Sequence, residues 1–165
     1  MKLRSALAAC ALLSLPLLAV AQDSPGQQAI RENKAMIQSR LADLDSERKA
    51  LVEDNMDLDE VEGAKFWPIY NSYRTEADKL SLEHLAILMD YASAYNQGAV
   101  TDAEARELQK RSLELEEERL ELKEKYLKRI AKEVSPRRAL RFLQIENRLN
   151  AMTVMAISQE VPLAQ

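Results

Sequence analysis

The feature that most constrains this chain is its near lack of helix-breaking residues. Of three glycines in 165 residues, only Gly63 and Gly98 lie beyond residue 26, and there are five prolines. Leu, Ala, Glu, Lys and Arg dominate, while β-branched residues are sparse. Such a composition favours long helices joined by few turns. The sequence therefore predicts an all-α fold without a β-sheet.

Three helix starts follow one repeated pattern, in which an apolar residue precedes a short polar residue. The pattern occurs as Leu58-Asp59-x-x-Glu62, Val100-Thr101-x-x-Glu104 and Val134-Ser135-x-x-Arg138. The polar residue caps a helix by accepting backbone N–H bonds, and a Glu three positions later accepts from the N–H of the cap. Pro136 suits the first helical position. We expect helices to begin near residues 60, 102 and 136, and apolar residues at helical spacing predict a fourth helix over 27–54.

The second and third of these helices should form a long hairpin over about 59–133. A five-residue connection, with Gly98 suited to ending a helix, forces antiparallel neighbours. Apolar residues in both segments alternate at spacings of three and four, as in a narrow coiled-coil seam. Leu113, Leu120 and Leu127, one heptad apart, are expected beside that seam.

The first 21 residues have the parts of an export signal. Lys2 and Arg4 precede an apolar run over 6–21, which ends in the small-residue site Ala19-Val20-Ala21. The run is short for a membrane span, which needs about 20 apolar residues. We predict cleavage before Gln22, a periplasmic location, and a single helical domain over 22–165 without a membrane span.

A lipoprotein is the alternative, because "LAAC" at 7–10 resembles a lipobox ending in Cys10. Most of the apolar run follows this cysteine, which disfavours that interpretation. Cys10 is the only cysteine, so cleavage after residue 21 excludes disulfides and thiolate chemistry. Loss of Lys2 and Arg4 also changes the net charge from −4 to −6. An acidic chain argues against a nucleic-acid partner, which requires a basic face.

The sequence offers little for catalysis or for a metal. His84 is the single histidine, no glycine-rich phosphate loop occurs, and the carboxylates lie in salt-bridging arrays. Met152 and Met155 have the i, i+3 spacing that could hold Cu(I), but methionine on an apolar helix face is usually core filler. We predict a non-enzymatic protein with no catalytic residue, cofactor or metal site; a metal-responsive protein is a minor alternative.

The aromatic stretch 66–73 has a counterpart 76 residues downstream. Shifted by that offset, the cap Asp59 aligns with Ser135 and Phe66 aligns with Phe142. An identical spacing from cap to aromatic is typical of helix packing, so both phenylalanines should be buried core residues. Trp67 lies one position off this face, where Pro68 should kink the helix. It either covers the kink or stays exposed for partners.

The two cap motifs resemble those of the Spy/CpxP-like periplasmic family, which includes zinc-resistance-associated proteins and carries a twice-occurring LTxxQ. Leu58, Asp59 and Glu62 match the first copy with Asp for Thr and Glu for Gln. Val134, Ser135 and Arg138 match the second, but Arg cannot both accept and donate as Gln does. The resemblance covers roughly 30–160. It implies a dimeric four-helix cradle with an apolar concave surface, acting as an ATP-independent chaperone or stress sensor, although the acidic mature chain lacks an evident basic cradle.

Two functions are therefore weighed. One is a periplasmic binding protein that holds unfolded clients or senses envelope stress through an apolar helical cradle. The other is a structural or adaptor hairpin that pairs with itself or with envelope proteins. The residues expected to contact a client or partner are Trp67, Tyr70, Met152 and Met155. Surplus apolar surface predicts a homodimer, since homo-oligomers usually close with two-fold symmetry.

Overall fold

The structure is a computed structural model that describes residues 23–98 and 100–164, and within these ranges it is all-helical. The all-α prediction is confirmed. Five helices follow one another: α1 (Pro25–Glu32), α2 (Lys34–Met56), α3 (Glu60–Asn96), α4 (Asp102–Glu133) and α5 (Pro136–Glu160). The export signal, its cleavage site and Cys10 lie outside the described residues.

Helices α3, α4 and α5 begin where their caps predicted. Asp59 accepts a 2.8 Å hydrogen bond from the Glu62 N–H, and the Glu62 carboxylate accepts from the Asp59 N–H. Thr101 starts α4 with the same reciprocal pair. Ser135 caps α5 through the Arg138 N–H at 3.2 Å. These bonds satisfy amides that a helix N-terminus otherwise leaves unpaired.

Where one N-terminal helix was predicted over 27–54, the structure has two, which meet at Asn33. The amide of Asn33 donates to the Ala29 carbonyl, a local bond that competes with the helix ladder. Helix α1 is held on α3, because the Gly26 N–H donates to Asp90 at 2.6 Å. A side chain at Gly26 would collide with the Ala86 carbonyl, so only glycine permits this approach. The break frees α2 to leave α3.

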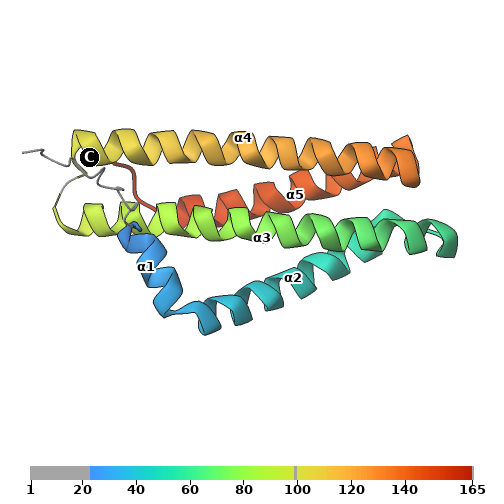
Figure 1. Cartoon of the computed structure of the whole chain (residues 1–165), viewed down its shortest axis with the longest axis horizontal. Coiled ribbons are helices and arrows are strands. Elements are labelled where there is room, and N and C mark those ends of the chain that lie inside the picture. The colour runs from blue at the N-terminus through green and yellow to red at the C-terminus, as the bar shows by residue number, and fades with distance from the viewer. Residues whose placement is uncertain (1–22, 99, 165) are drawn as a thin grey trace, which may run out of the picture.

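Helices α3 and α4 run side by side in opposite directions, and α5 returns along them from the far end of α4 (Figure 1). Helix α2 takes an oblique path and reaches the others near its C-terminal end, where it packs against α5. Helix α1 contacts α3 near the opposite end. Helices α1, α2 and α3 thus form the three sides of a triangle (Figure 1).

The hydrophobic core lies at the end of the molecule where α2 meets α3 and α4 meets α5. Phe66 and Phe142 are 0% and 1% exposed, which confirms them as core residues, and their rings contact edge-on with centroids 5.6 Å apart. Tyr73 and Tyr126 continue this aromatic cluster toward the middle of the rods. Residues that aligned at the 76-residue offset therefore touch one another.

At the same end, the residues three positions after the caps of α3 and α5 also contact each other. Arg138, at the position that aligns with Glu62, pairs with the Glu62 carboxylate at 2.6 Å and donates to the Met56 carbonyl at 3.0 Å. The hydrogen bonds from Arg138 are the main cause that lowers the pKa of Glu62. Arg138, which does not complete a capping box at the start of α5, thus joins the start of α5 to the capping box of α3.

Of the three leucines expected beside the seam of α4, Leu127 is partly buried against the core, whereas the expectation was wrong for Leu113 and Leu120. Leu113 and Leu120 are 64% and 57% exposed. The buried side of α4 is formed by Leu115, Leu122 and Tyr126. Leu113 precedes Leu115 by two residues, about 200° around the helix, so the two side chains point to different faces.

Candidate functional site

The structure has an open groove of about 760 Å³, here named the α2 groove. Side chains of α2, α3 and α5 form most of its lining, and α4 contributes at one side. The aliphatic lining includes Ile37, Leu41 and Leu44 of α2, Leu80, Leu85 and Leu88 of α3, and Met152, Val154 and Ile157 of α5. The groove exists because α2 carries an apolar stripe but leaves α3 after Asn33.

Several aliphatic side chains in this groove remain open to solvent. Met36 and Leu44 on α2 are each 60% exposed, and Met152 and Val154 on α5 are 61% and 59% exposed. Isolated exposed leucines are ordinary on protein surfaces, but apolar side chains that line one concave surface indicate a binding site. The two walls together present such a surface.

A buried polar cluster fixes α2 to α5 beside the groove. The Glu146 carboxylate, 1% exposed, accepts hydrogen bonds from Arg48 Nη2 at 2.8 Å and Nε at 3.2 Å. The Tyr73 hydroxyl donates to it at 2.8 Å. Arg48 Nη2 also donates to Asn150 at 2.8 Å. Burial, followed by the charge of Glu146, raises the pKa of Tyr73, so the phenol remains a donor at neutral pH.

A second ion cluster ties α2 to α3. Arg74 donates to Asp45 of α2 and to Asp78 of its own helix, each at 2.7 Å. Burial raises the pKa of Asp78, and the nearby Asp45 adds to this effect while Arg74 opposes it. The two clusters thus attach α2 to α5 and to α3 through polar contacts. Between these attachments, α2 presents aliphatic side chains to the groove.

The side of the groove toward α4 carries His84, Arg119 and Lys123. His84 is half-buried, and burial followed by the charge of Arg119 lowers its pKa. Its imidazole is therefore neutral at pH 7. His84 is a polar group among leucines, and no carboxylate of the described residues is hydrogen-bonded to it to orient it as a base.

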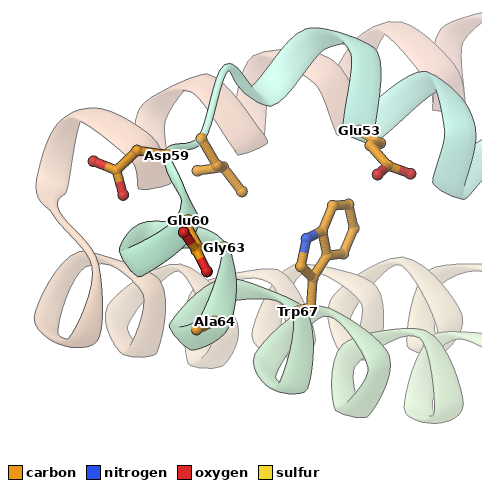
Figure 2. A pocket seen from close by; sticks show the side chains of 7 residues that line it. Glu53, Asp59, Glu60, Gly63, Ala64 and Trp67 are labelled. Carbon is orange, nitrogen blue, oxygen red and sulfur yellow. The ribbon is translucent and has the colours of Figure 1, made fainter.

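A second, smaller hollow of about 370 Å³ lies between the end of α2 and the start of α3. Figure 2 shows the indole of Trp67 facing Glu53 across it, with Asp59 and Glu60 at its other end. Trp67 packs edge-on against Phe66 at 5.1 Å, and the Lys49 ammonium lies 5.5 Å from its ring centre. Trp67 therefore covers the aromatic core with one side and borders an open hollow with another, while α3 continues as one helix through Pro68.

The four expected contact residues do not form one surface. Tyr70 is 1% exposed and lies in the core, so its assignment as a contact residue was wrong. Its hydroxyl has no hydrogen-bond partner among the described residues, and burial raises its pKa to about 12. Met152 lines the α2 groove, whereas Met155, 65% exposed, lies outside it. Trp67 borders the other hollow.

Sequence reasoning missed the Arg48–Glu146 cluster, although one signal was present. Glu146 follows Phe142 by four residues and precedes Leu149 by three, so it lies on the apolar face of its helix. A charge at such a position requires a buried partner. The partner is 98 residues away, and no local spacing identifies it.

Within residues 23–98 and 100–164, no group of three or more His, Cys, Asp or Glu side chains is placed to hold a metal ion. None of the helices in those ranges is long and apolar enough to cross a membrane. Comparisons of the chain with protein-family models, with curated proteins and with solved structures find no match.

Proposed function

We propose that this chain is a non-enzymatic periplasmic protein that holds apolar segments of unfolded or envelope proteins in the α2 groove. The observation that carries this proposal is the pair of walls, α2 and α5, on which aliphatic side chains about 60% exposed line a common hollow. An unfolded segment that inserts its aliphatic side chains there removes them from water, at about 25 cal/mol per Å² of apolar area buried.

We also propose that the chain is a distant Spy/CpxP-like protein, with α3 and α4 as the long hairpin of that fold. The two cap motifs on which the resemblance rests lie side by side, joined by the Glu62–Arg138 pair. The two substituted positions, Glu62 and Arg138, are thus complementary to each other, which supports a divergent copy of the family pattern.

An aggregation-suppression assay on the mature protein tests the function, with light scattering of a chemically unfolded client as the measurement. Leu44→Ser and Met152→Ser remove exposed apolar side chains from opposite walls, and neither residue belongs to the buried core. Leu140→Ser is the matched control, because Leu140 is 56% exposed on α5 outside both hollows. We expect both groove variants to lose suppression while the control retains it. Equal activity in all three would refute the groove as the binding site.

The adaptor function is a second candidate, favoured by Leu113 and Leu120. These leucines lie one heptad apart on the outer face of α4 and are both exposed. A homodimer or an adaptor contact through this face would be lost on Leu113→Glu. Size-exclusion chromatography with light scattering should then show a dimer for the native chain and a monomer for the variant. A native monomer at micromolar concentration would exclude the homodimer.

A further inference from the structure

The charges that line the α2 groove are unequally neutralised. Arg48 and Arg74 are occupied by the clusters that hold α2 in place. Lys123 of α4 and Arg40 of α2 also line the groove, and no ion pair to either occurs among the described residues. Among the lining carboxylates, Glu47 alone has no ion pair to a described residue. Arg74 has two carboxylates, Asp45 and Asp78, so the five cations of the lining are balanced by its four carboxylates together with Glu146. Positive charge is in excess only locally, where α4 contributes Arg119 and Lys123 but only one carboxylate, Glu116.

Two cations of the lining, both on α4, are close together and only partly exposed. Arg119 and Lys123 both line the groove and are four residues apart on α4, so they lie on one face of that helix. Arg119 Nη1 lies 3.2 Å from a carboxylate oxygen of Glu116. The side chain of Arg119 is 29% exposed and that of Glu116 is 71% exposed. Such a surface ion pair is weak, so Arg119 can bind a second anion. Lys123 is partly buried, and no ion pair to it occurs within residues 23–98 and 100–164. An anionic group at this position would gain two cations.

The size of the groove limits what can occupy it while α2 stays in place. A helix about 10–12 Å wide with a rise of 1.5 Å per residue fills roughly 120–170 Å³ per residue. The volume of about 760 Å³ would therefore hold only about five residues of a helix. The same volume lies within the range of roughly 300–1,000 Å³ that is usual for small-molecule sites. A slender ligand fits better than a folded segment.

We propose that the α2 groove binds a medium-chain fatty acid, with the carboxylate at Arg119 and Lys123 and the acyl chain among the leucines of α2 and α3. This inference rests on the proposed binding function, because it names a second ligand class for the same groove. The aliphatic lining removes the chain from water, and the two cations of α4 select an anionic head. The fatty acid would then compete with polypeptide clients.

Isothermal titration calorimetry on the mature protein tests the inference, with dodecanoate and dodecylammonium below their micellar concentrations as probes. The two have equal tails and opposite head charges. We expect dodecanoate to bind one per groove and at least tenfold more tightly than dodecylammonium. Lys123→Glu should weaken dodecanoate binding at least tenfold, and Lys123→Gln should weaken it by less. Lys128→Glu is the control, because Lys128 lies on the same helix and pairs with Glu124 outside the groove.

Circular dichroism and aggregation suppression on the same samples separate the outcomes. Undetectable dodecanoate binding, equal affinity for both probes, or equal loss in Lys123→Glu and Lys128→Glu would overturn the inference. If clients are still held in that case, the proposed function stands without a fatty-acid ligand. If neither dodecanoate nor clients bind, both proposals fail. Displacement of a held client by dodecanoate, but not by dodecylammonium, would support both.

Discussion

The buried contact between α2 and α5 allows a quantitative test of how α2 is held over the groove. In Arg48→Ala, the Glu146 carboxylate loses its ion pair with Arg48 and two of the three hydrogen bonds that it accepts from described side chains. It remains 1% exposed, so water cannot readily replace the guanidinium. Removal of one partner from a buried ion pair costs about 3–5 kcal/mol, because the remaining charge is uncompensated.

The reverse substitution should cost less. In Glu146→Gln the buried group becomes neutral and keeps its size, and the Tyr73 hydroxyl can still donate to the amide oxygen. Arg48 is 16% exposed and retains Asn150, so water can solvate part of its guanidinium. We expect a loss of about 1–2 kcal/mol, between the net values of a typical hydrogen bond and of one to a charged group. The double substitution Arg48→Met with Glu146→Leu should recover much of the stability, since apolar replacements of buried pairs are often neutral.

Urea unfolding monitored by circular dichroism measures these differences. With a slope of about 1–3 kcal/mol per M for a small protein, a loss of 3 kcal/mol lowers the midpoint by about 1–3 M. The cluster is supported as the attachment of α2 if the urea midpoint is lowest for Arg48→Ala, intermediate for Glu146→Gln and highest for the native chain. If Arg48→Ala costs less than about 1 kcal/mol, Glu146 is hydrated in solution and the cluster does not hold α2.

Three further predictions concern the core, the caps and the leader. Phe66→Ala and Phe142→Ala should each lower the free energy of unfolding by about 3–5 kcal/mol in urea titrations, and losses below about 1 kcal/mol at both would mean that these rings are not in the core. Because Arg138 lowers the folded-state pKa of Glu62, this pair should stabilise the fold above the ordinary carboxyl pKa and cease to do so as pH falls through the lowered value. The stability difference between the native chain and Glu62→Gln should therefore disappear toward acid pH, and a difference that grows in acid would contradict the pairing. Mass spectrometry of periplasmic protein should find an N-terminus at Gln22, whereas a lipid-modified cysteine would establish the lipoprotein alternative.

The sequence predicted the helix starts well because each depends on neighbouring residues. An Asp or Ser cap and the residue three positions later settle whether a helix begins, whatever the remainder of the chain does. The burial of Phe66 and Phe142 was also accessible, since their shared distance from a cap fixes their helix face.

Features that depend on distant residues could not be predicted in this way. The break at Asn33 accompanies the docking of Gly26 on Asp90, 64 residues away. The periodicity of 27–54 gives no sign of that contact. Leu113 was assigned to the wrong face because α4 has leucines on two faces, and only the position of its neighbours shows which is covered. The α2 groove results from the same break at Asn33, so it could not be predicted from a local sequence pattern.

The pairing of Glu62 with Arg138 has a consequence for how such a chain can change over time. Aligned positions that touch each other lie near a local two-fold axis, as residues do at the centre of a symmetric dimer. In a dimer of identical hairpins, each such position would meet its own copy, and a charge there would face a like charge. Because one chain carries both halves, the two positions vary independently and hold opposite charges. The Glu62–Arg138 pair thus favours contact between the two different halves, and a separated α2–α3 hairpin that paired with itself would place two Glu62 carboxylates together.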